Sequence, residues 1–432
     1  MLRPQSVSFG FRTVVMFAAI LAASGAVHGQ QAGAAKASSA PKPHVRAVTA
    51  FINLDRSQYQ LQIAETAKFL GYAKTVFESR GYTVETLRIV TQPFPQYTQG
   101  LSAEDAVRLF KNLDGLAEQY NVRLCIGPAY LAGNDGDAQA DLLATILQNT
   151  KNIFGSLVVT SDSGINWPAV NAAARVMKKL AETTDHSEGN FRFAANANVP
   201  PYAAFFPGSY HTGGGHQFAI GLASAGLITA AAEGAPDLAT ARRKIIDTFF
   251  NAAFDVEDLA MRVDREQGWI YLGLDLSPAP APDASIGAAI ETISKQPFGS
   301  SGTMTAVGTI TSALKEIGAR RTGYSGLMLP VLEDPLLVER WNQGRVSLDA
   351  LLSYSAVCAT GLDTIPLPGD TSVADLARII GDVATLSVKW NKPLSARLLP
   401  IAGKQAGERT EFTDPYLMNG VIRPLPGKEQ VQ

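Results

Sequence analysis

Residues 45–54 read Val-Arg-Ala-Val-Thr-Ala-Phe-Ile-Asn-Leu, and the segment that follows, 57–80, has apolar residues at helical spacing. The first run is rich in β-branched and apolar side chains, which is typical of a buried strand, and the second predicts a helix that covers it. A second strand is predicted at 83–90. A strand, a helix and a strand in this order indicate a unit with two parallel strands.

The same order recurs along the rest of the chain. Further strands are predicted at 122–126, 154–160, 218–222, 269–276, 326–332, 364–367 and 395–401. Further helices are predicted at 102–120, 139–148, 168–184, 238–263, 284–293, 303–317, 335–341, 348–355 and from residue 372 onward. Two of these helices begin with capping boxes, in which a serine precedes an aspartate by three residues. These pairs are Ser102 with Asp105 and Ser372 with Asp375.

Alternating strands and helices predict an α/β protein whose mostly parallel sheet is covered on both faces. The chain has about nine or ten such strands and no Pro/Ser-rich linker after residue 44. We therefore expect a single large β/α barrel of about ten strands over residues 45–425, followed by a tail at 426–432. Two domains, with a hinge in the proline-rich loop 278–282, are the alternative.

Composition excludes several classes of protein. Of the 432 residues, 46% are hydrophobic and 18% charged, and the net charge is −2, which excludes a disordered chain. Basic and acidic residues are nearly balanced, at 37 and 39, and give no reason to expect nucleic-acid binding. Two cysteines are too few for a disulfide scaffold or a Cys-rich zinc protein.

The N-terminus is typical of a signal peptide. Arg3 and Arg12 precede an apolar run at 13–23, and small residues surround a cleavage point that we place after Gly29. Residues 30–44 are rich in Ala, Gln, Ser, Lys and Pro and predict a disordered tether. The apolar run is shorter than the roughly 20 residues of a membrane span, so we expect a periplasmic or secreted protein with no span in the mature chain.

Four short motifs carry a family resemblance. They are Ser163-Gly-Ile-Asn166, Gly273-Leu-Asp-Leu-Ser-Pro-Ala-Pro280, Gly361-Leu-Asp-Thr-Ile-Pro366 and Ala396-Arg-Leu-Leu-Pro400. Over residues 45–415 the chain resembles the uncharacterised bacterial and archaeal family called domain of unknown function 711. The resemblance implies a ten-stranded barrel similar to that of pyruvate formate-lyase, and it implies no activity. The export signal, the tether and the Gly-rich loop 210–216 depart from the family's usual pattern.

A barrel of this kind suggests glycyl-radical chemistry, and Arg321-Thr-Gly-Tyr324 looks like the motif around a radical glycine. We expect no such radical. The motif should follow the active-site cysteine, near the C-terminus, whereas Gly323 precedes Cys358 and opens a predicted strand. We interpret Gly323 as a loop glycine whose φ is positive.

The loop before residue 218 holds the first candidate site. Histidine serves as acid, base or metal ligand near neutral pH, and His211 and His216 flank a run of glycines. His211 is the leading catalytic candidate, and Gly213 and Gly214 would let the backbone approach a ligand. If a divalent metal is bound, His211, His216 and Asp275 are its expected ligands. A surface loop with incidental histidines is the alternative.

Charged groups within or beside apolar strands give further catalytic candidates. Asp275 and Asp363 each follow a leucine in such a strand, and a carboxylate there is costly unless it is partnered or functional. Each could instead be a cap or an ion-pair partner. Cys358 is a candidate nucleophile. Cys125 lies in an apolar strand, and a disulfide between the two cysteines stays open.

The remaining candidates would bind substrate. Asp55, Ser163 and Asn166 follow predicted strands, where β/α barrels place their ligands. Ser301 and Thr303 precede a helix and could hold an anion, although a helix cap is the alternative. Arg397 in the last strand could clamp a carboxylate, or it could pair with Asp275 or Asp363.

The leading hypothesis is an exported barrel enzyme that uses acid–base chemistry on a small polar metabolite, such as a carboxylate, a phosphate or a sugar derivative. It requires His211 and at least one of Asp275 and Asp363 to share a cavity. A non-catalytic periplasmic ligand-binding protein and a structural or assembly partner are the alternatives. The sequence leaves the substrate, metal dependence, cofactor and formation of a homo-oligomer undetermined.

Overall fold

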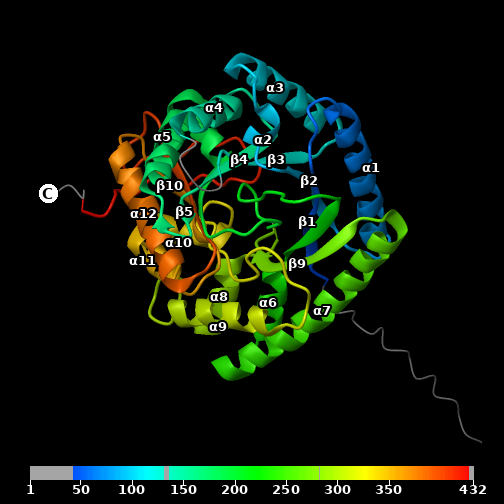
Figure 1. The fold of residues 1–432 in the computed structure, drawn as a ribbon. Helices are drawn as coiled ribbons and strands as arrows, with labels where there is room; N and C mark the ends of the chain where they lie inside the picture. Colours follow the sequence, from blue (N-terminus) through cyan, green and yellow to red (C-terminus); the bar gives the residue numbers. More distant parts are fainter. Residues whose placement is uncertain (1–41, 131–135, 282, 428–432) are drawn as a thin grey trace, which may run out of the picture. The chain divides into compact units, whose positions relative to one another are not determined.

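A nine-stranded sheet organises the part of the chain that the structure, a computed structural model, describes: residues 42–130, 136–281 and 283–427 (Figure 1). The expected signal peptide, the tether up to residue 41 and tail residues 428–432 lie outside these ranges. The strands are β1 (His44–Ile52), β2 (Val84–Thr91), β3 (Arg123–Pro128), β4 (Ile153–Val158), β7 (Phe193–Ala197), β8 (Gln217–Ala223), β9 (Ile270–Ala279), β10 (Gly361–Pro368) and β11 (Leu394–Ile401).

Strand direction divides the sheet into three groups. Its order is β10-β11-β7-β4-β3-β2-β1-β8-β9. The five central strands, from β7 to β1, are parallel to one another. The outer pairs, β8–β9 and β10–β11, are each parallel internally but antiparallel to the central strands. The structure is therefore α/β with a mostly parallel sheet, and the carboxyl ends of the outer strands point opposite to those of the central ones.

One extended segment touches both edges of the sheet. Arg321 forms a parallel bridge with Leu274 of β9, and Pro330 forms another with Asp363 of β10. The expected strand 326–332 is thus replaced by two isolated bridges within residues 321–330.

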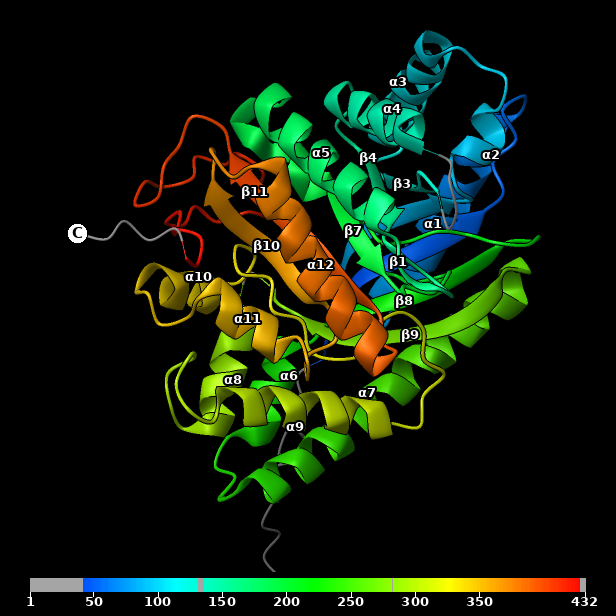
Figure 2. The same ribbon diagram turned by 60° about the vertical axis from the view of Figure 1, so that its left-hand side comes forward.

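Helices surround the sheet (Figures 1 and 2). They are α1 (Tyr59–Glu78), α2 (Pro95–Thr98), α3 (Ala103–Gln119), α4 (Gly136–Gln148), α5 (Trp167–Thr183), the 3₁₀ helix η1 (Asp185–Arg192), α6 (Ala225–Ala232), α7 (Leu238–Gln267), α8 (Ile286–Ser294), α9 (Thr303–Glu316), α10 (Pro335–Asn342), α11 (Leu348–Tyr354) and α12 (Val373–Trp390). Most of these helices pack on the outer side of the sheet, whereas α8, α9 and α10 pack mainly on other helices. A small hairpin, β5 (Thr160–Ser161) and β6 (Gly164–Ile165), precedes α5. No described helix has both the length and the apolar character that crossing a bilayer requires.

The inner side of the sheet is filled partly by the loop 198–216, which crosses the centre of the view in Figure 1. Its backbone bonds to the central strands: the amide of His211 donates to the carbonyl of Thr91, and Ala204 accepts from the side chain of Arg88. Phe206 belongs to an apolar cluster with residues of β1, β3 and β4. The loop therefore fills one part of the interior and leaves space toward the amino ends of the central strands.

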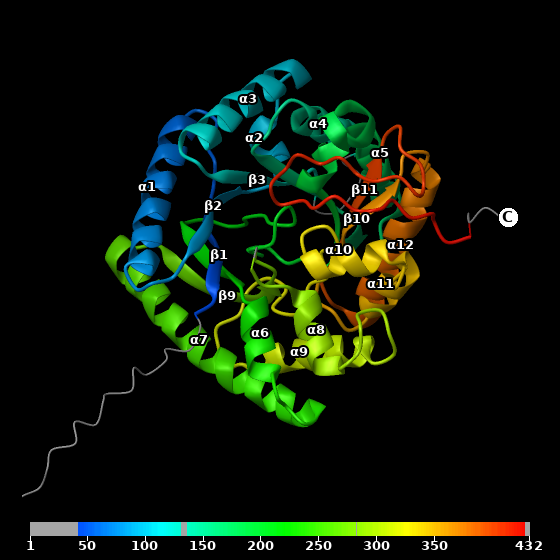
Figure 3. The ribbon, with the colours of Figure 1, turned by 180° about the vertical axis from the view of Figure 1, so that it is seen from behind.

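The C-terminal segment 402–427 passes beside β11 and α10 (Figure 3). The indole of Trp341 in α10 donates to the carbonyl of Val421 at 2.7 Å, and the amide of Met418 donates to the carbonyl of Leu332 at 2.7 Å. Tyr416, on this segment, reaches the interior space described below.

Most predicted elements are confirmed to within a few residues. Ser372 and Asp375 form the complete capping box that was predicted, while Ser102 accepts from the amide of Asp105 at 3.1 Å as an N-cap. The sequence reading missed β7, α6 and the short helices α2 and η1. It also assigned His44 to the tether, although this residue begins β1.

Candidate functional site: an arginine-lined cavity

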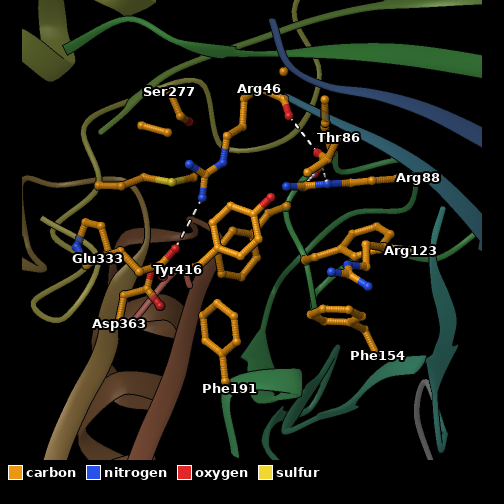
Figure 4. A pocket seen from close by; sticks show the side chains of 18 of the residues that line it. Arg46, Thr86, Arg88, Arg123, Phe154, Phe191, Ser277, Glu333, Asp363 and Tyr416 are labelled. Atoms are coloured by element: carbon orange, nitrogen blue, oxygen red, sulfur yellow. Dashed lines mark hydrogen bonds and ion pairs between the residues drawn. The ribbon is translucent and has the colours of Figure 1, made fainter. Parts of the chain in front are cut away.

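A cavity of about 120 Å³ opens on the inner side of the sheet, near the amino ends of the central strands (Figure 4). One water needs roughly 10–15 Å³ of such space, so a small molecule fits. Six lining residues are basic and four are acidic. The basic ones are Arg46, Arg88, Arg123, Lys151, Arg192 and Arg397, and the acidic ones are Asp275, Glu333, Asp363 and Asp414.

One side of the cavity has its charges paired. Arg397 of β11 donates from Nε to Asp363 at 2.6 Å and from its terminal nitrogen to Glu333. Glu333 also accepts from Arg46 of β1 at 3.2 Å, and Arg46 has a second ion pair with Glu85. The pairing of Arg397 with Asp363 was one of the two alternatives that the sequence left open. These contacts tie outer strands to a central strand.

The other side holds two arginines that form no ion pair among the described residues, although the charge of Asp414, which also lines the cavity, attracts Arg123. Arg88 of β2 and Arg123 of β3 are register partners on adjacent parallel strands, and both line the cavity. Arg88 donates to the hydroxyl of Thr86 at 3.0 Å and to the carbonyl of Ala204 at 3.0 Å, and Arg123 donates to the side-chain oxygen of Asn152. Within the described ranges, neither has a carboxylate within 4.0 Å. Figure 4 shows them on the side opposite Glu333 and Asp363.

Burial also disfavours the charged form of Arg88. It is only partly accessible, and removal from water together with the positive charge of Arg46 lowers the pKa of Arg88 to about 9. Glu85 and Glu333 favour its charged form, but both are already paired with Arg46. The ring of Phe206 lies 4.8 Å from the guanidinium and gives some compensation. A bound anion would stabilise the charged guanidinium much more strongly than the ring does.

The Asp275 carboxylate serves as a cap. It accepts from the hydroxyl and amide of Ser277 at 2.5 and 3.0 Å, and from the amides of Tyr324 and Ser325 at 3.3 and 3.1 Å. Burial raises the pKa of Asp275, and these donors oppose the shift. A Cβ on Gly323 would overlap this carboxylate, and Gly323 has φ +64°, as the sequence interpretation expected. Asp275 thus holds the segment at 321–330 against β9.

His211 lies beside the other ends of the central strands. Its Nδ1 is 3.1 Å from Oδ1 of Asn53, and its Nε2 is 2.8 Å from Oε1 of Gln217. The amide groups of Asn53 and Gln217 donate to the carbonyls of Gly213 and Gly214, which turns both amide oxygens toward the ring. His211 is fully buried, and its burial lowers its pKa. The neutral ring has one N–H, which donates to one of these two amide oxygens, so His211 fastens the loop.

The expected pairing of His211 with Asp275 or Asp363 is not formed. Asn53 follows the end of β1, whereas Arg46, which belongs to the ion-pair network of Asp363, lies near its start. Seven residues of strand span about 23 Å. The expectation assumed that all strand ends meet at one mouth, but the outer strands run opposite to the central ones. Their carboxyl ends therefore lie at the other end of the sheet.

The proposed metal ligands also lie apart. His216 is exposed and stacks on Trp269 at 4.8 Å, while His211 and Asp275 have the partners given above. Within the described ranges, no three His, Cys, Asp or Glu side chains are placed to hold a metal ion. The prediction that His211, His216 and Asp275 form one metal-binding cluster was therefore wrong.

The other candidates have local roles outside the cavity. Asp55 accepts from Ser57 at 2.8 and 2.7 Å, Ser163 bonds to Ser161 at 2.8 Å, and Asn166 caps α5. Thr303 accepts from the amide of Gly299 at 3.1 Å and is buried, while Ser301 is exposed. Cys358 and Cys125 are buried free thiols.

The sequence reading missed Arg46, Arg88, Arg123 and Glu333. A signal for Arg88 was present, because a charged side chain in the apolar strand 83–90 is as costly as the carboxylates that were selected. Arg88 lies inside its strand, whereas the predicted candidates lie mostly at the ends of strands. Glu333 lies in a loop whose position the sequence does not indicate.

Comparison with known proteins places the chain among uncharacterised sequences. A family model described as "Uncharacterised ACR (DUF711)" matches residues 39–414. A UPF0210 protein of Pyrobaculum islandicum is 34% identical over 346 residues, covering 76% of each chain. UPF0210 proteins of Methanococcoides burtonii and Carboxydothermus hydrogenoformans are 30% and 28% identical, covering 80% and 83% of this chain and 82% and 81% of theirs.

Proposed function

Because the chain belongs to the uncharacterised DUF711 family, whose matched names state no activity, we propose a function from the cavity itself: the protein binds a small anion, a carboxylate or a phosphate, between Arg88 and Arg123. The observation that carries the proposal is the register pairing of these two arginines on β2 and β3, with no described carboxylate within 4.0 Å of either. Like charges directly opposite on neighbouring strands are destabilising. An acid group between them would turn this repulsion into two attractions.

The hydrogen bonds left open by these arginines support the same conclusion. A guanidinium carries five N–H groups. Arg88 uses two of them, toward Thr86 and Ala204, and Arg123 uses one, toward Asn152. The remaining N–H groups can meet the two oxygens of a carboxylate in a forked geometry.

The engagement of the acidic residues favours binding over catalysis. Of the four lining carboxylates, Asp363 and Glu333 are paired with Arg397, and Asp275 accepts four hydrogen bonds. Asp414 accepts from the amide of Tyr416 at 2.9 Å. An acid–base enzyme needs a group that is free to exchange a proton with its substrate. We therefore propose a ligand-binding protein in preference to the enzyme that the sequence suggested.

We retain the barrel as a proposed architecture. The bridges Leu274–Arg321 and Pro330–Asp363 connect both sheet edges to one segment, and this segment is parallel to β9 and β10. Five central strands would then face five strands of opposite direction. An experimental structure with a continuous ladder from β9 through residues 321–330 to β10 would establish the closure, and a gap on either side of this segment would refute it.

Export also remains a proposal, supported by the apolar run at 13–23 and the small residues before Gln30. Expression of the full chain in a Gram-negative host, followed by N-terminal sequencing of the protein in the periplasmic fraction, tests it. We expect a new N-terminus at Gln30. A protein that stays in the cytoplasm with its first residues intact would contradict export.

The binding proposal is tested by calorimetric titration of the full chain with sodium phenylacetate and with sodium phosphate. We expect at least one of these anions to bind the unsubstituted protein, and Arg88→Met and Arg123→Met to weaken that binding at least tenfold. Arg108→Met is the matched control, because Arg108 is exposed on α3 and paired with Asp105. Equal binding to the unsubstituted protein and to Arg88→Met, or no binding of either anion, would contradict the proposal.

A further inference from the structure

We propose that the bound acid has an apolar body, so that the ligand is an aromatic or branched aliphatic carboxylic acid and not a sugar phosphate or another polyhydroxylated anion. This inference rests on the proposed function and specifies the part of the ligand beyond its acid group. It comes from three observations: the apolar wall, the engagement of the lining hydroxyls and the position of the wall beside the arginines.

The uncharged wall of the cavity is mainly apolar. Aromatic and aliphatic side chains from several elements form it: Phe154, Phe191, Phe205, Phe206, Leu222 and Met328. Burying a methylene of a ligand against such a wall raises affinity about fourfold. The wall therefore favours a hydrocarbon skeleton.

The lining hydroxyls offer little to a sugar. Only Thr86, Ser277 and Tyr416 among the lining residues carry one. Thr86 donates to the carbonyl of Arg46 at 2.6 Å and accepts from Arg88, and Ser277 donates to Asp275 and accepts from the amide of Gly326 at 3.3 Å. The hydroxyl of Tyr416 alone has no hydrogen bond within the described ranges. Hydroxyls of a sugar body that lie against the apolar wall, away from the charged residues, would have no partners, which is costly.

The apolar wall begins directly beside the acid-binding arginines. Phe154 of β4 is the register partner of Cys125, two residues beyond Arg123 on β3, so its ring lies on the adjacent strand (Figure 4). Phe206 faces the guanidinium of Arg88 and packs against Phe154 with 5.3 Å between ring centroids. A ligand with its carboxylate on the arginines would therefore place its next carbons against these rings.

The inference is tested by calorimetry on the full chain with sodium acetate, phenylacetate, glucose 6-phosphate and inorganic phosphate. We expect phenylacetate to bind at least tenfold more tightly than acetate, and more tightly than either phosphorylated probe. Phe154→Leu should lower the ratio of phenylacetate to acetate affinity several-fold. Phe254→Leu, the same change at an exposed position on α7, should leave this ratio unchanged and serves as the control.

The outcomes separate the two proposals. If glucose 6-phosphate or phosphate binds most tightly and Arg88→Met abolishes that binding, the apolar-acid inference is overturned while the anion site stands. If phenylacetate gains nothing over acetate, or Phe154→Leu leaves the ratio unchanged, the apolar-acid inference is also overturned. If none of the four anions binds in a manner that Arg88→Met weakens, the proposed function fails with it.

Discussion

Arg88 and Arg123 are opposite each other on β2 and β3, line the same cavity, and have no carboxylate within 4.0 Å in the part of the chain that the structure describes. Neighbouring strands lie about 4.8 Å apart, so the two side chains leave the sheet side by side. Like charges on neighbouring strands repel each other. The unliganded fold tolerates this repulsion, and a bound acid would remove it.

The pH dependence of binding should follow Arg88. Its pKa is lowered to about 9, and only its charged form attracts an anion. Phenylacetate affinity is therefore expected to be level from pH 6 to 8 and to fall about tenfold for each pH unit above 9. Calorimetry between pH 6 and 10 measures this. Affinity that falls below pH 8, or stays level to pH 10, would contradict the assignment.

Deprotonation of Arg88 should lower the affinity for the anion but raise the contribution of Arg88 to the stability of the fold. In the unfolded chain the guanidinium has its ordinary, much higher pKa, so above about pH 9 the unfolded state binds more protons than the folded one. The contribution of Arg88 to the free energy of unfolding therefore rises with pH in this window and is constant below it. Affinity and this contribution to stability should change in opposite directions above pH 9.

His211→Ala tests the role of His211 in fastening the loop. The substitution leaves the side-chain oxygen of buried Gln217 without its partner, and we expect a loss of about 1–3 kcal/mol in the free energy of unfolding. His216→Ala is the control, since His216 is exposed, and should change stability by less than about 0.5 kcal/mol. Urea denaturation measures both, and equal effects would refute this role.

Gly323→Ala tests the attachment of the segment at 321–330 to β9. A Cβ at φ +64° would overlap the Asp275 carboxylate, so we expect a loss of about 2 kcal/mol or more in the free energy of unfolding. Gly115→Ala in α3 is the matched control. Its Cβ would meet no atom within 4 Å, and helix propensity predicts a gain of about 0.5–1 kcal/mol. Tolerance of Gly323→Ala without loss would contradict the described contact.

The regular elements could be predicted because their signals are local. The capping box at Ser372 and the β-branched run of β1 depend only on neighbouring residues. The strand β7, Phe-Ala-Ala-Asn-Ala, was missed because alanine and asparagine carry no strand signal and its pairing with β4 and β11 is a long-range contact. Tertiary context determines such a strand.

The candidate site could be predicted only in part. Asp363 and Arg397 were identified because charged groups in apolar strands need partners, and they are each other's partners. The prediction that His211 shares a cavity with Asp275 or Asp363 was wrong because a strand's sequence does not encode its direction within the sheet. The register of the strands could not be predicted either. Arg88 and Arg123 are 35 residues apart in the sequence, so no local pattern indicates that they lie opposite each other.

The coupling between Arg88 and Arg123 tests the central claim most directly. Urea unfolding of the full chain, Arg88→Met, Arg123→Met and the double variant gives their interaction free energy, with and without saturating phenylacetate. We predict a repulsive coupling of about 1–3 kcal/mol without ligand, and a favourable coupling with ligand, because the acid group needs both arginines. A coupling that is zero or attractive without ligand, or one that phenylacetate leaves unchanged, would contradict the claim.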